Sequence, residues 1–352
     1  MTDRSKESGG QLRQASTLHP ASERILPYDA LRVFALLCVL GIHALMQTRA
    51  YPAAPHLMRL LDQELSFIAV PLLVFISGAL VWAPEWHEKY GAFLKKRFMR
   101  VGLPYIIWFL CYAVVVYLRQ GPGEVSAAWL VKNFFSGNLW FHLYFIPMIF
   151  TFYLLTPLAS KVLHSAKYAP ELLFLVLVLA KVVIWPAVSP LLRAGVGAPL
   201  WSQAAHDVAH LPEMALGAWF ALRFQKIRRV RRAPVSAQAL VIPLEAVGRS
   251  AVASRTTYFM IGALSFIAFF STPYLKKIQA PLKVLASASF GIYLLHPLIL
   301  LAIQALVKSC GATALWVNGW FVFGVFAVLL AASAAIAWGL SRSRATAWLI
   351  GV

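Results

Sequence analysis

Ten apolar stretches follow one another along the chain, separated only by short loops. A helix that crosses a bilayer needs about 20 mostly apolar residues, and most of the stretches reach or approach that length. Their apolar residues run on without alternation, which excludes an outer-membrane barrel. The sequence therefore predicts an all-α fold, a polytopic transmembrane helical bundle of about ten helices. The stretches are residues 28–47, 64–82, 101–118, 139–158, 169–186, 206–223, 235–247, 257–272, 285–306 and 315–340.

The stretch 235–247 gives the weakest signal of these. It is short and contains Pro243 and Glu245, and both a proline and a charge disfavour a membrane-embedded helix. We expect either a half-helix here or one irregular unit formed together with 257–272.

Basic residues determine the expected orientation. The chain has 32 Lys and Arg against 13 Asp and Glu, a net charge of +19. In a soluble protein this excess would indicate nucleic-acid binding, but here the cations stand in loops between apolar stretches. With the N-terminus inside, alternate loops hold 22 Lys and Arg on the cytoplasmic side and 8 on the other. The positive-inside rule then puts both termini in the cytoplasm, and no nucleic-acid partner is expected.

The chain divides into three expected regions. Residues 1–24 are polar and lack the apolar core of a signal peptide, so we expect a disordered cytoplasmic tail. Residues 25–342 form the transmembrane domain, and residues 343–352 a cytoplasmic C-terminal tail. The three cysteines lie in or beside apolar stretches and indicate neither a disulfide framework nor a metal site; they are Cys38, Cys111 and Cys310.

Three ionisable residues interrupt the first apolar stretch. Arg32 and His43 are 11 residues apart, so on a helix they share one face and lie about 16 Å apart along the axis. Asp29 precedes Arg32 by three residues and can pair with it. Ionisable groups at this depth are expensive and usually functional. The structural alternative is that Arg32 reaches the cytoplasmic headgroups and His43 bonds a neighbouring helix.

A basic cluster precedes the third stretch, in FLKKRFMRVGLPYIIW, residues 93–108. Arg97 and Arg100 are three residues apart and are expected on one face where the helix begins, with Lys96 beside them. Guanidinium groups and the free N–H groups of a helix start together suit a polyphosphate. Topology anchoring and contact with anionic lipid explain the same residues equally well.

Aromatic residues gather at the outer end of the fourth stretch. Trp140 and His142 stand in LWFHLYF, which forms either an interfacial belt or the wall of a sugar site. In the second case both residues contact the substrate. Pro147 and Pro157 are expected to kink this helix.

Two later stretches also carry polar groups at helical spacing. His206, His210 and Glu213 share one stripe, which favours acceptor binding or proton handling, with hydrogen bonding between helices as the alternative. Their spacing lacks a metalloprotease signature, so a zinc site has only weak support and no metal is expected. Tyr293 and His296 stand three residues apart in SFGIYLLHPL. His296 is a further substrate-binding candidate, or half of a packed polar pair.

Together these stretches resemble acyltransferase family 3, the membrane-bound O-acyltransferases of bacterial surface polysaccharides. The resemblance covers about residues 24–342 and rests on four places. RILPYDALRVFALLCVLGIHAL is similar to the opening of the family, where ten residues separate an arginine from a histidine, here Arg32 and His43. RFMR matches an R-x-x-R element through Arg97 and Arg100. LWFHLYFIPMIFTFYLLTPL and SFGIYLLHPL are similar to its middle and late segments, although the family often has an apolar or aromatic residue in place of His142.

The resemblance implies an integral O-acyltransferase of the bacterial inner membrane, with residues 25–342 as its acyltransferase domain. It would move an acyl group, usually acetyl, from cytoplasmic acyl-coenzyme A to a hydroxyl of an extracytoplasmic carbohydrate. Acetyl-CoA is then the donor co-substrate, and a surface polysaccharide or its lipid-linked precursor is the acceptor. Besides these two substrates only membrane lipids are implied as partners, and no metal is needed.

The same resemblance suggests roles for the unusual residues. An imidazole suits the removal of a proton from the attacking hydroxyl, so His43 is either the general base or a transient carrier of the acyl group. Arg32, paired with Asp29, holds the donor or steers charge along the path. Lys96, Arg97 and Arg100 bind the phosphates of the coenzyme, and Trp140, His142, His210, Glu213 and His296 contact the acceptor.

A transporter or flippase for a lipid-linked sugar or a small solute is the main alternative. Intramembrane His, Arg and Asp residues also suit proton-coupled transport. However, transporters commonly contain two related halves, and the sequence has no recognisable internal repeat. A non-catalytic membrane anchor does not explain matched polar residues at opposite depths. Whether the chain forms a homo-oligomer is left open.

Overall fold

The structure is a computed structural model, and it describes residues 26–84, 90–121, 123, 125–184, 186, 199–230, 261–265, 267–268 and 271–352. All regular structure in these residues is helical, which confirms the predicted all-α fold. The predicted tail 1–24 and the stretch 235–247 lie outside the described residues, as do residues 257–260, 266, 269 and 270 of the stretch 257–272.

The helices follow the predicted stretches, and several continue into a short 3₁₀ or π turn. In chain order they are α1 Leu26–Leu45 with η1 Met46–Ala50, α2 His56–Ser77 with η2 Gly78–Trp82, α3 Tyr90–Arg97, η3 Phe98–Gly102, α4 Leu103–Gln120, α5 Ala127–Ser136, α6 Phe145–Leu163, α7 Ala169–Leu179 with η5 Ala180–Ile184, α9 Pro199–Val230, α11 Thr272–Leu275 with η7 Lys276–Ile278, α12 Gln279–Ser309, η8 Thr313–Val317, α13 Gly319–Ser341, α14 Arg344–Ala347 and η9 Trp348–Ile350.

Six of the helical stretches in the described part of the chain are long and apolar enough to cross a membrane. They are Leu26–Ala50, His56–Trp82, Tyr90–Gln120, Phe145–Leu163, Thr272–Ser309 and Gly319–Ser341. The chain is thus a helical membrane protein. Helix α5 was not expected, because it lies in the predicted loop after α4. Ser126 caps its first turn by accepting a bond from the Trp129 N–H, and Gly137 ends it in the left-handed conformation.

Helix α1 contributes to two apolar cores. Its first turns, including Tyr28, Leu31 and Ala35, pack with α2, α6, α7 and α9. Its second half, from Leu36 to Leu45, packs with α4, α12 and α13. Because α1 contributes to both cores, its polar residues lie at the centre of the bundle and not at its edge.

Close backbone contact joins the end of α2 to α9. A Cβ atom on Gly217 would lie 1.9 Å from the Phe75 carbonyl oxygen, and one on Gly78 would lie 2.0 Å from the Met214 carbonyl oxygen. No side chain fits at either position. Small residues that allow two backbones to meet are typical of helix contacts in membranes.

The basic cluster does not stand at a helix start, contrary to the prediction. The helix already begins at Tyr90 and continues through the π turn η3 into α4, because no residue between Tyr90 and Arg100 breaks it. The first free N–H groups therefore lie near Tyr90, and Lys96, Arg97 and Arg100 lack them. Pro104 accounts for the π turn, since it has no N–H to offer the Arg100 carbonyl and its ring crowds that oxygen.

Of the two prolines expected to kink the fourth stretch, only Pro157 lies inside the helix, because α6 starts at Phe145 and Pro147 belongs to its first turn. Pro157 leaves the Tyr153 carbonyl without its usual helical donor. The Tyr90 hydroxyl donates to that carbonyl at 3.0 Å. This bond fixes the start of α3 against α6.

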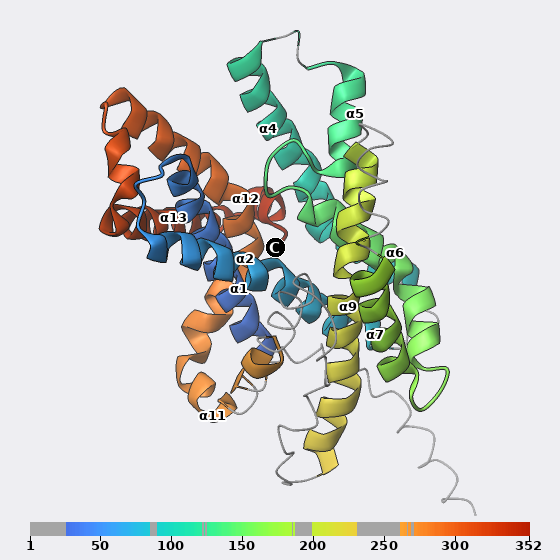
Figure 1. The fold of residues 1–352 in the computed structure, drawn as a ribbon. Helices are drawn as coiled ribbons and strands as arrows, with labels where there is room; N and C mark the ends of the chain where they lie inside the picture. Colours follow the sequence, from blue (N-terminus) through green and yellow to red (C-terminus); the bar gives the residue numbers. More distant parts are fainter. Residues whose placement is uncertain are drawn as a thin grey trace, which may run out of the picture.

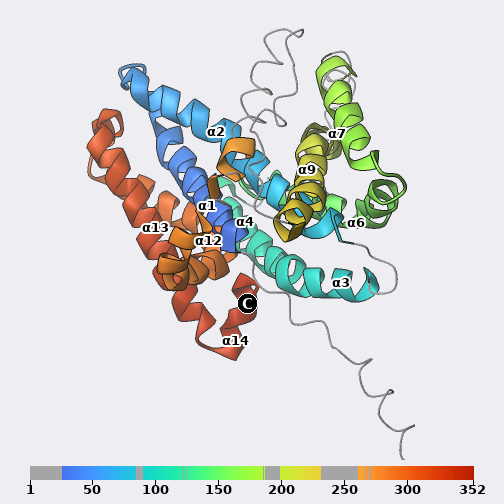
Figure 2. The same cartoon turned by 90° about the horizontal axis from the view of Figure 1, so that it is seen from below.

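The loops lie at two opposite ends of the molecule. In Figure 1 the end of α4 and the start of α5 are at the top, while α11 and the α6–α7 turn are at the bottom. The count of Lys and Arg in the loops predicts the same grouping. It puts the loop between α4 and α5 on one side of the membrane, and α11 and the α6–α7 loop on the other. Seen from below, α14 and the residues after it lie close to the start of α4 (Figure 2), where η9 contacts α4 and η3. That the lower end faces the cytoplasm stays a prediction.

Candidate functional site

Three histidines from distant parts of the chain meet in one cluster. The His43 ring on α1 stacks on the His296 ring on α12, with centroids 5.1 Å apart. His142, in the loop before α6, places its ring edge-on to His296 at 5.5 Å. His142 is 2% exposed and His296 is 0% exposed. We call these three residues the histidine cluster.

Several nitrogens of the histidine cluster have no hydrogen-bond partner among the described residues. They are His43 Nδ1, both ring nitrogens of His142, and His296 Nε2. The nearby indole N–H of Trp140 is also buried without a partner. Buried polar atoms are normally satisfied, and an unpaired one costs free energy. So many together make the histidine cluster a candidate binding site for a polar molecule.

Aromatic rings surround the histidine cluster. Phe141 lies 4.5 Å from the His43 ring, centroid to centroid. Tyr112 contacts both Trp140, at 5.0 Å, and His142, at 5.2 Å. The aromatic residues before α6 thus line the histidine cluster. Their role as the wall of a sugar site stays a prediction.

Two tyrosine hydroxyls fix the backbone around the cluster. Tyr293 donates to the His142 carbonyl, and Tyr112 donates to the Leu294 carbonyl at 2.8 Å. Gly137 turns the loop with φ of 67°, and a Cβ there would lie 2.4 Å from the Tyr144 Cα atom. The loop that carries His142 is therefore held at both of its ends.

The other polar residues of α1 lie in the opposite half of that helix. Arg32 pairs with Asp29 at 3.3 Å, as the three-residue spacing predicted. Asp29 is 4% exposed. The guanidinium groups of Arg32 and Arg97 both interact electrostatically with the Tyr153 hydroxyl. Of these two arginines, Arg97 also lies over the Tyr153 ring.

Arg97 and Arg100 occupy different surroundings. The Arg97 guanidinium lies 5.2 Å from the ring centroids of both Phe93 and Tyr153, in cation–π geometry, and its side chain is half-buried. Arg100 and Lys96 are exposed. A three-residue spacing on an α-helix separates side chains by about 60°, but η3 begins directly after Arg97. The π turn therefore rotates Arg100 away from the shared face that the sequence predicted.

A family model described as an acyltransferase domain, acyltransferase family 3, matches residues 27–338. The chain belongs to acyltransferase family 3. No curated protein and no solved structure matches it. The family and the apolar helices together make the chain a membrane acyltransferase, which confirms the resemblance read from the sequence.

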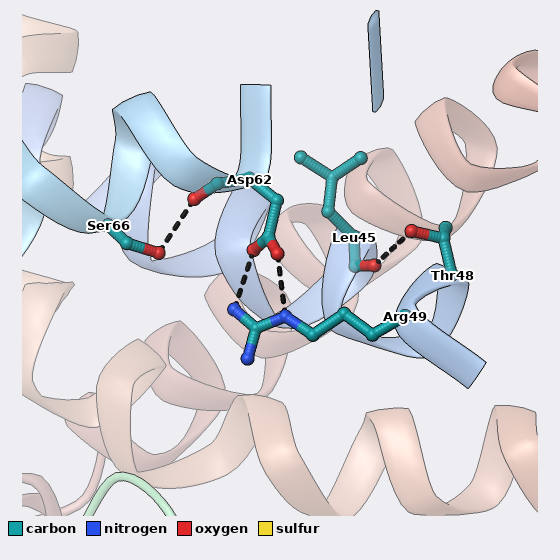
Figure 3. A network of polar contacts seen from close by, with 5 residues as sticks. All are labelled: Leu45, Thr48, Arg49, Asp62 and Ser66. Carbon is teal, nitrogen blue, oxygen red and sulfur yellow. Dashed lines mark hydrogen bonds and ion pairs between the residues drawn. The ribbon is translucent and has the colours of Figure 1, made fainter. Parts of the chain in front are cut away.

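An ion pair joins η1, directly after the C-terminal end of α1, to α2 in the acyltransferase. The Arg49 Nε and Nη2 atoms donate to the two oxygens of Asp62 at 2.6 and 2.9 Å (Figure 3). Ser66 donates to the Asp62 carbonyl on the next turn of α2. Arg49 also interacts electrostatically with His43. Arg49 was not among the predicted site residues, although an arginine just past the apolar stretch 28–47 was an available signal.

His210 and Glu213 lie away from the histidine cluster, in a second polar group. Glu213 is 0% exposed and accepts a 2.6 Å bond from the Lys181 ammonium on η5. His210 Nδ1 lies 3.8 Å from the other Glu213 oxygen. The side chain of His206 lies outside the described residues. Lys181 was missed as a site residue, although a lysine inside the stretch 169–186 marks it.

A metal site does not arise in the described part of the acyltransferase, where no three His, Cys, Asp or Glu side chains are arranged to hold an ion. The histidine cluster has stacked and edge-on rings, and ligands of one ion would instead point their nitrogens at a common centre. Acid–base chemistry by imidazole needs no such centre.

Proposed function

We propose that the acyltransferase moves an acetyl group from cytoplasmic acetyl-coenzyme A to a hydroxyl of an extracytoplasmic carbohydrate, a surface polysaccharide or its lipid-linked precursor. The protein would then act in the bacterial inner membrane with both termini in the cytoplasm. The observation that supports this most is the histidine cluster, where buried unpaired nitrogens stand beside Trp140 and Phe141. Flat aromatic faces suit a sugar ring, and polar atoms without partners suit its hydroxyl groups.

In this proposal His43 acts as the general base. The acceptor oxygen attacks the thioester carbonyl as its proton passes to the His43 imidazole, which suits proton transfer near neutral pH. The new C–O bond forms and the C–S bond breaks. Coenzyme A leaves as a thiolate and takes up one proton, so the overall proton count is unchanged. His142 and His296 hold the acceptor hydroxyls, and Trp140 offers its N–H.

The donor is bound at the other end of the path. The coenzyme phosphates are bound by Arg97, Arg100 and Lys96. Arg32 is paired with Asp29 and adds a positive charge on α1 between this site and His43. The electrostatic interaction of both Arg32 and Arg97 with Tyr153 supports a common region of positive charge. On an α-helix Arg32 and His43 are about 16 Å apart, a span that the flexible thioester arm of the coenzyme has to bridge.

The proposal is tested with purified protein in vesicles, with labelled acetyl-coenzyme A on the face that exposes Arg100 and a carbohydrate acceptor inside. His43→Ala should lower turnover by about 100-fold or more, as loss of a general base does. His56→Ala is the matched control, because this histidine is exposed at the first turn of α2. Near-normal turnover in a folded His43→Ala variant would exclude His43 as the base. Acceptor movement without acetyl transfer would favour the flippase.

A further inference from the structure

Residues 348–351 fold back onto the basic end of the α3–α4 helix. Gly351 has a φ of 75°, and a Cβ atom there would lie 2.3 Å from the Arg100 carbonyl oxygen and 2.9 Å from Phe290 Cδ1. A residue with a side chain is thus excluded here for two reasons: the backbone conformation favours glycine, and a Cβ atom would collide with these neighbours. The backbone of Gly351 rests directly against the peptide of Arg100.

The Arg100 carbonyl is an unusual place for such a contact. Pro104 stands four residues later and has no N–H to bond this oxygen. The helix passes through the π turn η3 at this point. Turns of this kind are rare, are less favourable than α-helix and occur mostly at functional sites. A π turn that keeps one geometry therefore needs support from outside the helix.

The turn of residues 348–351 supplies that support through two further contacts. The Trp108 indole N–H on α4 donates to the Leu349 carbonyl at 2.9 Å. Ile350 is 1% exposed and lies over Gly291 on α12, where an added Cβ would be 2.9 Å from the Ile350 Cβ. The turn of residues 348–351 therefore packs between α12 and the η3–α4 junction.

The contacts of this turn continue to the histidine cluster. Phe290, which touches Gly351, stacks on Tyr293 with an interplanar angle of 12°. Tyr293 in turn bonds the His142 carbonyl. One packed series of residues thus leads from Arg100 to the loop that carries His142.

We propose that Gly351 is a positioning residue for donor binding: it holds the π turn so that Arg100 projects toward the coenzyme phosphates while Arg97 stays packed on Tyr153. This inference rests on the proposed donor role of Arg100. It assigns a part in the site to residues 348–351, which the sequence indicated only as a tail.

The test compares Gly351→Ala with Gly311→Ala in nanodiscs, using acetyl-coenzyme A as the probe. Gly311 also has a positive φ, of 66°, but an added Cβ there meets nothing within 4 Å. Both variants carry the same backbone strain, and only Gly351→Ala collides with Arg100. We expect Gly351→Ala to weaken acetyl-coenzyme A binding and raise its KM by about tenfold with kcat within about twofold, a pattern of lost uniform binding. Gly311→Ala should bind like the wild type.

Arg100→Ala separates the two proposals. If Arg100→Ala weakens binding and a folded Gly351→Ala does not, the positioning role is wrong and the donor site stands. If Arg100→Ala binds normally, the donor site is wrong and the positioning role falls with it. Should Gly351→Ala fail to fold, Trp108→Phe decides, because it removes only the N–H that bonds the Leu349 carbonyl. Wild-type binding and KM in a folded Trp108→Phe variant would then overturn the inference.

Discussion

The imidazole rings of His43 and His296 lie stacked, 5.1 Å between centroids and 19° between planes, on helices from opposite ends of the chain. His296 Nδ1 faces the Ile292 carbonyl at 3.2 Å, while its Nε2 has no partner among the described residues. One side of the His296 ring is thus used by its own helix, and the other is available to a substrate.

This arrangement predicts different results for two substitutions of His296. His296→Phe keeps a flat ring against His43 but loses the free nitrogen, so turnover should fall at least about tenfold with little change in melting temperature. His296→Ala should lose turnover and also melt lower, because a buried ring is removed. Turnover and thermal unfolding of the two variants check this. Wild-type turnover in His296→Phe would show that the ring only packs.

Tyr293→Phe should destabilise the acyltransferase by about 1 kcal/mol, the usual net value of one hydrogen bond. The substitution removes the donor to the His142 carbonyl and leaves the ring contacts. Tyr117→Phe is the control, because that side chain is 46% exposed. Thermal unfolding in detergent measures both. A melting temperature that falls no further than in the control would contradict the role of the bond.

The Arg49–Asp62 pair should show coupling in a double-mutant cycle. Asp62 is 7% exposed and is bonded through both oxygens, so Arg49→Leu leaves a buried carboxylate without its partner. We expect a coupling energy of about 1 kcal/mol from Arg49→Leu, Asp62→Leu and the double variant. Arg59→Leu is the control, since Arg59 bonds only the Pro52 carbonyl. Additive effects on unfolding would mean that the pair contributes nothing.

Gly217→Ala should abolish folding or lower the melting temperature strongly. The new methyl group would lie 1.9 Å from the Phe75 carbonyl, and two packed helices cannot separate without losing their contacts. Gly324→Ala is the matched control on α13, where nothing lies within 4 Å of an added Cβ. Expression and size-exclusion profiles compare the two. Equal behaviour would disprove the close contact between α2 and α9.

Glu213→Gln tests whether the second polar group is structural. The variant keeps the shape of the side chain but removes the charge that the Lys181 ammonium contacts at 2.6 Å. Breaking a buried ion pair lowers the free energy of unfolding by about 3 kcal/mol or more. Adding Lys181→Met should restore part of this lost stability. Unfolding and acceptor KM are measured together. A raised KM without destabilisation would instead place Glu213 at the acceptor.

Sequence periodicity alone was enough for much of the fold. Apolar runs predict helices because a segment in lipid must satisfy its own backbone groups, and the positions of α1, α12 and α13 follow from this. The Asp29–Arg32 pair was also predictable, since both residues stand on one helix three residues apart.

Contacts between helices were decided only by the tertiary structure. Within one helix, spacing fixes which side chains are neighbours, but the meeting of His43, His142 and His296 depends on how α1, α12 and the loop before α6 pack. The π turn after Arg97 could not be read from spacing either; it occurs where Pro104 leaves the Arg100 carbonyl without its usual helical donor. The sequence determined which residues enter the membrane, and tertiary packing decided which of them meet, because helix faces are set locally while their partners come from distant parts of the chain.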